Sequence, residues 1–169
     1  EKVQKLFQSG YAYYKKGNYD QAIKDYSEAI KLDPGHVEAW INRGDAYADK
    51  GDYDQAIKDF SRAIELDHTY VDVWRQRGLA YIKRGARGSA IKDFSEAIRL
   101  DPDFYAAWYN RGIAYGHKDN YNQAIKDFSE AIKLDPAAAV AWNNRGRAYA
   151  RKENYDQAIK DFSEAIKLD

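Results

Sequence analysis

Residues 40–63 read WINRGDAYADKGDYDQAIKDFSRA, and variants of this stretch recur along the chain. Its first glycine repeats at a constant spacing of 34 residues, at Gly10, Gly44, Gly78, Gly112 and Gly146. A tyrosine follows each of these glycines, at Tyr13, Tyr47, Tyr81, Tyr115 and Tyr149. Such a period indicates a row of small helical units that stack on their neighbours, rather than one globular core.

Each copy of the stretch predicts two helices. Trp40, Gly44 and Tyr47 follow one another at spacings of four and three residues, which places them on one helical face. Asp52, with Gln55 three residues later, has the pattern of a capping box that starts a second helix. The other copies have Asn18/Gln21, Ala86/Ser89, Asn120/Gln123 and Asn154/Gln157. The pair Ala86/Ser89 breaks this pattern. Since losing such a cap lowers the stability of a helix by about 1 kcal/mol, we expect the turn at Ala86 to be the loosest of the five.

The chain resembles the tetratricopeptide repeat family through Trp40, Gly44, Tyr47, Ala56, Phe60 and Ala63, and again through Trp108, Gly112, Tyr115, Ala124, Phe128, Ala131 and Pro136. The resemblance implies one domain over residues 1–169, made of five repeats at residues 3–36, 37–70, 71–104, 105–138 and 139–169. It implies an all-α fold, an α-solenoid of helix-turn-helix repeats with a right-handed superhelical twist. The first helices of such a fold line a concave groove that holds peptides or partner helices.

Composition narrows the possible functions. The 27 Lys and Arg residues balance the 27 Asp and Glu residues, which argues against a general binder of nucleic acid or of acidic membranes. There is no cysteine, and the three histidines share no metal-ligand spacing, so we expect no metal and no cofactor. Ser27 and Ser61 belong to a series that recurs in every repeat, so they are not candidate nucleophiles and no enzyme activity is expected. The sequence leaves the compartment open, with a cytoplasmic location favoured.

An arginine precedes the repeated glycine in four copies, at Arg43, Arg77, Arg111 and Arg145, while the first copy has Ser9. Each predicted second helix carries an aspartate in one register, at Asp25, Asp59, Asp93, Asp127 and Asp161. An arginine could pair within its own repeat, as Arg43 with Asp59, or with the preceding repeat, as Arg43 with Asp25. The second choice explains why the first repeat has no arginine, because no earlier aspartate would be there to meet it. We therefore predict the inter-repeat pairs Asp25–Arg43, Asp59–Arg77, Asp93–Arg111 and Asp127–Arg145. The alternative is an arginine that packs its stem and keeps its head group in water.

Binding residues are expected at the groove positions that the resemblance implies. These are Phe7, Tyr11, Tyr14, Ile41, Asn42, Asp45, Arg75, Leu79, Ile82, Lys83, Tyr109, Asn110, Ile113, His117, Asn143, Asn144, Arg147 and Arg151. In chain order this surface begins aromatic, becomes acidic, then apolar, and ends basic. The asparagine amides could hydrogen-bond a peptide backbone.

These positions predict a protein–protein interaction scaffold whose ligand is a peptide with apolar anchors and a carboxylate near Arg147 and Arg151. For the aromatic residues of the first repeat, the alternative is that they only cover an exposed end. An alternative function is self-association. The predicted last helix has an apolar stripe, Ala158, Ile159, Phe162 and Ile166, that no later helix covers and that could accept the first helix of another copy, head to tail.

Overall fold

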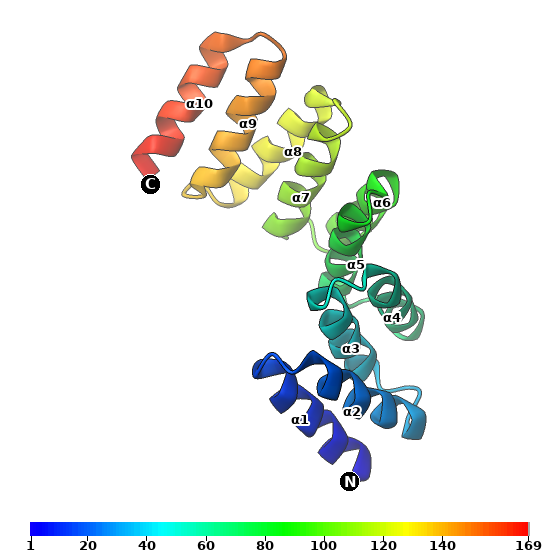
Figure 1. Cartoon of the computed structure of the whole chain (residues 1–169). Coiled ribbons are helices and arrows are strands. Elements are labelled where there is room, and N and C mark those ends of the chain that lie inside the picture. Colours follow the sequence, from blue (N-terminus) through cyan, green and yellow to red (C-terminus); the bar gives the residue numbers. More distant parts are fainter. Residues whose placement is uncertain (169) are drawn as a thin grey trace. The chain divides into compact units, whose positions relative to one another are not determined.

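The computed structural model describes residues 1–168, which contain ten helices and no strand (Figure 1). The helices are α1 (Lys2–Lys15), α2 (Tyr19–Leu32), α3 (Val37–Asp49), α4 (Tyr53–Leu66), α5 (Val71–Lys83), α6 (Arg87–Leu100), α7 (Tyr105–Gly116), α8 (Tyr121–Leu134), α9 (Ala139–Arg151) and α10 (Tyr155–Leu168). The predicted all-α solenoid of helix-turn-helix repeats is confirmed. None of these ten helices is long and apolar enough to cross a membrane.

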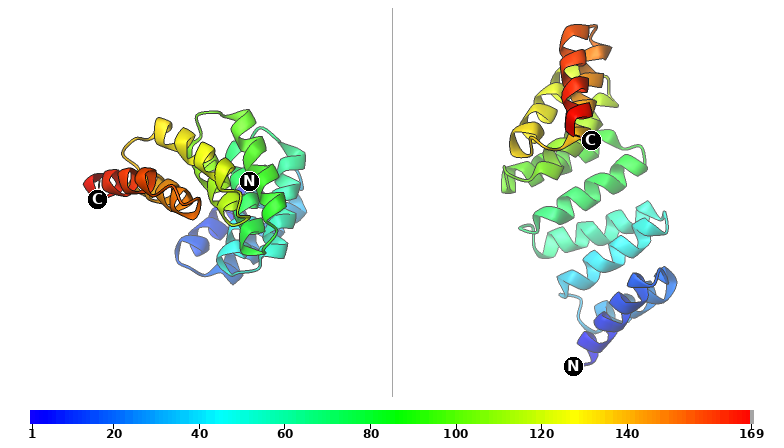
Figure 2. Two further views of the ribbon diagram at one scale, coloured as in Figure 1. Left: turned by 90° about the horizontal axis from the view of Figure 1, so that it is seen from above. Right: turned by 90° about the vertical axis from the view of Figure 1, so that its left-hand side faces the viewer.

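The chain forms two compact parts, residues 1–85 with α1–α5 and residues from 86 on with α6–α10. Within each part, every helix packs against the next one along the chain. Figure 2 shows this stacking inside each part from two further directions. Repeats 1, 2, 4 and 5 each lie inside one part, whereas repeat 3 contributes α5 to the first part and α6 to the second.

The repeated glycine lets the two helices of one repeat approach closely. A methyl group at Gly44 on α3 would lie 2.7 Å from Cε1 of Phe60 on α4, well inside contact distance. The distance from such a methyl group to the ring of the second helix is 2.8 Å at Gly10 and 2.9 Å at Gly146. The aromatic ring therefore fills the space that a larger residue would need, which explains why glycine recurs there.

Side-chain caps start four of the second helices, as the capping-box pattern predicts. Asn18, Asp52, Asn120 and Asn154 each accept a hydrogen bond from the backbone N–H of the glutamine three residues later, at 3.2–3.3 Å. The reciprocal half of the box is wrong for Gln21, Gln123 and Gln157, because these side chains instead donate to Asp25, Asp127 and Asp161. Ala86 provides no side-chain cap to α6, and the looseness of that turn stays a prediction.

The predicted inter-repeat arginine–aspartate ladder is wrong. Arg43 donates from Nε and Nη2 to both carboxylate oxygens of Asp59, inside its own repeat. The same two-pronged pairing joins Arg111 to Asp127 and Arg145 to Asp161. These partners lie on the paired helices of one repeat, and the edge of the planar guanidinium meets the carboxylate through two parallel hydrogen bonds. In repeat 1, Ser9 takes the place of the arginine and donates to Asp25 at 2.6 Å.

A different contact of the same arginine does join adjacent repeats. Nη1 of Arg43 donates to the hydroxyl of Ser27 at 2.9 Å, and Ser27 in turn donates to the backbone carbonyl of Ile23. The equivalent arginine–serine bonds are Arg77–Ser61, Arg111–Ser95 and Arg145–Ser129. The recurring serine is therefore a structural acceptor between repeats.

Candidate functional site: a basic hollow in the C-terminal part

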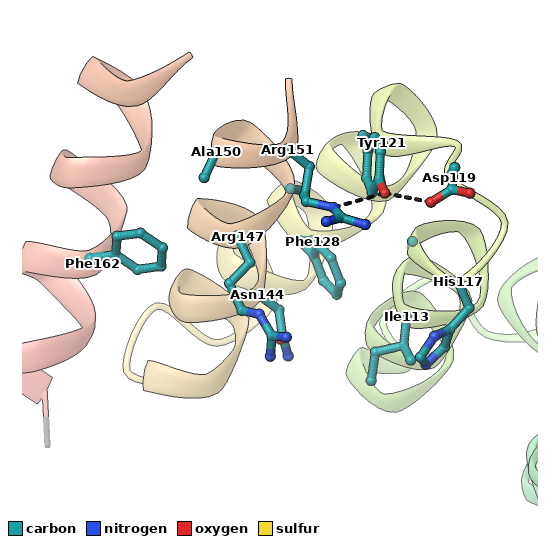
Figure 3. A pocket seen from close by; sticks show the side chains of 12 residues that line it. Ile113, His117, Asp119, Tyr121, Phe128, Asn144, Arg147, Ala150, Arg151 and Phe162 are labelled. Carbon is teal, nitrogen blue, oxygen red and sulfur yellow. Dashed lines mark hydrogen bonds between the residues drawn. The ribbon is translucent and has the colours of Figure 1, made fainter. Parts of the chain in front are cut away.

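An open hollow of about 710 Å³ lies on the C-terminal part, between the first helices of repeats 4 and 5 and the turn that follows α7 (Figure 3). Its lining residues are Ile113, Gly116, His117, Asp119, Tyr121, Phe128, Asn144, Arg147, Ala148, Ala150, Arg151 and Phe162. Five of them, Ile113, His117, Asn144, Arg147 and Arg151, are predicted groove residues. The fold thus brings the basic end of the predicted groove together in one concave place.

The floor of this hollow is apolar and tightly packed. Phe128 is 3% exposed and forms one buried cluster with Ala124 and Ala148, against which Ile113 packs. In Figure 3 the ring of Phe128 lies beside Asn144 and Arg147, between α9 and α7. Since a core cluster supports this floor, its shape does not depend on a ligand.

One wall is held by a hydrogen bond between repeats. The amide nitrogen of Asn144 donates to the hydroxyl of Tyr109 at 2.8 Å. The Tyr109 ring stacks on Tyr105, with a ring separation of 5.7 Å and an interplanar angle of 11°. Burial raises the pKa of Tyr109, with the hydrogen bond from Asn144 acting in the opposite direction. The Asn144 side chain, which lines the hollow, is therefore held in place by a hydrogen bond to the preceding repeat.

Three side chains form a linked row at the opposite edge. Tyr121 donates from its hydroxyl to the Asp119 carboxylate, and the same hydroxyl accepts from Nε of Arg151 at 3.1 Å (Figure 3). The Arg151 guanidinium also lies 5.7 Å from the centre of the Tyr121 ring. This row restrains Arg151, whereas Arg147 has no ion pair or hydrogen bond of its side chain within residues 1–168.

Asp119 has a strained backbone. Its φ is +58°, the left-handed region, at the register position that Gly17, Gly51 and Gly85 occupy in the first three repeats. Glu153 has the same conformation in repeat 5, with φ of +60°. A residue with a side chain is less stable than glycine in this conformation by about 1 kcal/mol. One such strained residue, Asp119, lines the hollow.

The predicted groove residues of the N-terminal part form an acidic and aromatic surface. Tyr14 donates to Asp49 at 2.6 Å, and burial together with this hydrogen bond raises the Tyr14 pKa. Asp45 accepts from the amide of Gln76 at 2.6 Å. Burial raises the pKa of Asp45 to about 7; Asp49 and Asp72 act in the same direction, while the hydrogen bond from Gln76 opposes it.

The remaining predicted residues are dispersed. Phe7 stacks on His36 with ring centres 5.0 Å apart, and Tyr11 is 46% exposed beside Lys15. Arg75 is paired with Asp72 on its own helix. Ile41, Asn42, Leu79, Ile82 and Asn110 are half-buried, Lys83 is exposed, and Asn143 lines a second hollow beside α10. A binding role for all of these residues stays a prediction.

Family profiles cover most of the repeats. Two profiles are described as tetratricopeptide repeat: one matches residues 7–70, and the other matches residues 105–137 and 139–169. A third, described as TPR repeat, matches residues 78–119. The chain belongs to the tetratricopeptide repeat family. No curated protein sequence matches it.

Solved structures of MamA and YrrB share the fold of this chain. A crystal structure of MamA is 28% identical, with a TM-score of 0.94 over 99% of this chain and 92% of that chain. MamA from Desulfovibrio magneticus RS-1, from its residue 41 to its end, is 20% identical, with a TM-score of 0.93 over 99% of this chain and 95% of that chain. YrrB, a TPR protein with an unusual peptide-binding site, is 23% identical, with a TM-score of 0.83 over 96% of this chain and 84% of that chain. The last two likenesses concern the fold alone.

Two polar residues of the hollow were not among the predicted positions of the tetratricopeptide repeat groove. Asp119 lies in the turn after α7 and Tyr121 begins α8, whereas the predicted groove positions lie on the first helices or, for His117, at the C-cap of α7. A signal was present in the sequence, because Asp119 interrupts the register of turn glycines, Gly17, Gly51 and Gly85. Its consequence for the hollow depends on side-chain directions that spacing does not provide.

Proposed function

We propose that this tetratricopeptide repeat scaffold binds an extended segment of a partner protein, and that a carboxylate of this segment meets Arg147 in the hollow of the C-terminal part. The family and the repeat fold support a role in protein interaction. The observation that carries the finer proposal is Arg147, an exposed guanidinium that lines a concave site without an acidic partner within residues 1–168.

The chemistry of the lining suits such a ligand. A guanidinium binds a carboxylate through two parallel hydrogen bonds, which fixes orientation as well as charge. His117 and Arg151 add donors at the rim, while Ile113 and Phe128 offer an apolar surface for a neighbouring side chain. A hollow of about 710 Å³ is in the size range of small-ligand sites, so it accommodates a few residues of a peptide.

The test uses two pools of fluorescent random octapeptides, one with a free C-terminal carboxylate and one with a C-terminal amide. The protein should retain sequences with a terminal or side-chain carboxylate, and Arg147→Gln should weaken their binding at least tenfold. Arg99→Gln is the matched control, because Arg99 is an exposed arginine of the same part that is paired with Glu96 outside the hollow. Equal binding by the two variants, or no preference for carboxylates, would overturn the proposal.

Head-to-tail self-association is less well supported. In repeats 2–5 the third position is a buried small residue, Ala39, Val73, Ala107 or Ala141, each at most 2% exposed. Repeat 1 has Lys5 there, on the helix that a second copy would have to insert. Burying an unpaired ammonium group is costly, which argues against α1 as the docking helix. Light scattering over a concentration series tests this point, and a rise in mass with concentration would favour self-association.

A further inference from the structure

The two arginines of the basic hollow have acidic counterparts in the N-terminal part. Asp45 on α3 occupies the register position that Arg147 occupies on α9. One helical turn further, Asp49 occupies the position of Arg151, and the other repeats have a basic residue or histidine there, Lys15, Lys83 or His117. The same surface of a repeat is thus acidic in repeat 2 and basic in repeat 5, so the two surfaces suit ligands of opposite charge.

Both carboxylates accept hydrogen bonds from neutral donors only. Asp45 accepts through Oδ1 from the Gln76 amide. Asp49 accepts through Oδ2 from the Tyr14 hydroxyl. Within residues 1–168 the other oxygen of each carboxylate makes no hydrogen bond or ion pair. Two single acceptors, one helical turn apart on the same face of α3, are therefore open to a ligand.

Basic residues on the neighbouring first helices do not pair with these carboxylates. Arg75 on α5 donates to both oxygens of Asp72 instead. Lys15 on α1 has its ammonium group 5.9 Å from the centre of the Tyr11 ring and forms no ion pair within residues 1–168. The negative charge of this surface is therefore not neutralised by the part of the chain that the structure describes.

A buried hydroxyl behind this surface has no hydrogen bond. The second-helix aromatic residue is Tyr26 in repeat 1 but phenylalanine in the other four repeats, including Phe128 in the floor of the basic hollow. Tyr26 is 0% exposed, and its hydroxyl has no hydrogen bond of normal geometry within residues 1–168. Burial raises the Tyr26 pKa to about 12; the nearby Asn42 amide opposes this, while Asp45 acts in the same direction. The hydroxyl therefore lies toward Asn42 and Asp45, and it lacks the partner that a buried polar group normally has.

Aromatic rings border the carboxylates on the side of α1. The rings of Tyr14 and Tyr19 lie 5.6 Å apart at an angle of 53°. Tyr11, one turn before Tyr14, is 46% exposed. Ring faces attract cations and also pack against the methylene groups of a long side chain. The surroundings of Asp45 and Asp49 therefore suit a cation on an aliphatic stem.

These residues form an acidic surface on α1 and α3, with Tyr26 behind it: Tyr11, Tyr14, Asn42, Asp45 and Asp49. We propose that the acidic surface binds a lysine side chain from an extended segment of a partner protein. The ammonium group donates to the open oxygens of Asp45 and Asp49, and the Tyr26 hydroxyl becomes its third acceptor as the ligand moves the side chains above that hydroxyl. The methylene groups lie on Tyr11 and Tyr14.

The acceptors select lysine rather than arginine. A guanidinium binds best to a carboxylate that offers both oxygens, as Asp59 does for Arg43. Asp45 and Asp49 each offer one, and an ammonium group has three donors that suit separate single acceptors. The inference rests on the proposed role in protein interaction but not on Arg147, which lies in the other part of the chain.

The experiment uses the intact chain at pH 8, where Asp45 is ionised. Its probes are pools of random octapeptides without other charged residues, acetylated at the N-terminus, amidated at the C-terminus and labelled with an uncharged dye. The central residue is fixed as lysine, Nε-acetyl-lysine or arginine. The lysine pool should be retained about tenfold better than the acetyl-lysine pool and better than the arginine pool. Equal retention of the lysine and acetyl-lysine pools, or preference for arginine, would overturn the proposal.

The matched variants Asp49→Asn and Glu28→Gln each remove one negative charge from the N-terminal part. Glu28 is exposed on α2, outside the acidic surface, so its loss should leave the Kd of the retained lysine peptides unchanged. Asp49→Asn keeps an acceptor for Tyr14 but should raise this Kd about tenfold, because a charge-assisted hydrogen bond is lost. Arg147→Gln should leave it unchanged, which separates this site from the basic hollow.

Tyr26→Phe tests the buried hydroxyl. Phenylalanine occupies this position in every other repeat, so the variant should fold and unfold at the same temperature as the parent or a higher one. Its Kd for the lysine peptides should rise about threefold, because the ammonium group loses one acceptor. An unchanged Kd in Tyr26→Phe or in Asp49→Asn would overturn the proposal.

Discussion

The Arg43 guanidinium and the Asp59 carboxylate form a two-pronged ion pair inside repeat 2, with Nε–Oδ2 at 2.7 Å and Nη2–Oδ1 at 2.8 Å. The Arg43 side chain is 16% exposed and the Asp59 side chain 4% exposed, so water solvates neither group well. In repeat 1 the equivalent aspartate, Asp25, accepts from a neutral donor, the Ser9 hydroxyl. The chain therefore contains one structural contact with a charged donor and the same contact with a neutral donor.

This pair of contacts predicts unequal losses of stability. Asp59→Ala should lower the free energy of unfolding by about 3 kcal/mol, because it leaves a largely buried guanidinium without its carboxylate. Asp25→Ala should lower it by about 1 kcal/mol, since it removes hydrogen bonds from neutral donors only. Urea denaturation followed by circular dichroism measures both. Equal losses of unfolding free energy in the two variants would show that leaving the Arg43 guanidinium unpaired has no additional cost.

Close helix packing predicts opposite effects of alanine at two glycines. Gly44→Ala should destabilise the protein by about 1–3 kcal/mol, because the new methyl group would lie 2.7 Å from the Phe60 ring. Gly88→Ala should stabilise it by about 0.5–1 kcal/mol, since nothing lies within 4 Å of the added methyl group in α6. Thermal unfolding of the two variants compares them directly, and a stable Gly44→Ala protein would show that Phe60 can move aside.

The positive φ of Asp119 and Glu153 predicts that glycine at either position changes stability alike but changes peptide binding differently. Asp119→Gly and Glu153→Gly should each stabilise the protein by about 0.5–1 kcal/mol, because glycine adopts positive φ without strain. Both remove one negative charge, but only Asp119 lines the hollow. Asp119→Gly should therefore tighten the binding of carboxylate peptides about threefold, whereas Glu153→Gly should not. Anisotropy titrations at low salt would detect this difference, and equal affinities would remove Asp119 from the site.

The raised pKa of Asp45, about 7, predicts a pH dependence of stability. An aspartate of the unfolded chain has a pKa of about 3.9, so the folded protein binds one more proton between pH about 4 and about 7. The contribution of Asp45 to stability is therefore lost as the pH rises through this range. Asp45→Asn keeps an acceptor for Gln76 and should be more stable than the parent at pH 8 but not at pH 5. Urea denaturation at both values checks this, and an equal difference at the two pH values would contradict the shift.

Some of the site follows from sequence position and some depends on side-chain direction. The spacing of Ile113, His117, Asn144, Arg147 and Arg151 is enough to place them on the facing first helices of two successive repeats, because helical period and repeat length together fix the register. The hydrogen bond between Asn144 and Tyr109 joins residues 35 positions apart and depends on rotamers. Spacing alone does not select it.

The sequence by itself determined the repeat, the two helices of each repeat and the glycine–aromatic contact. The reason is that a 34-residue period, with a glycine and an aromatic residue at fixed positions in each repeat, allows few other arrangements. Only the tertiary structure decided which carboxylate each arginine meets. Asp25 and Asp59 are both plausible partners of Arg43 by register, and the bidentate geometry within one repeat selects Asp59, leaving one nitrogen for Ser27.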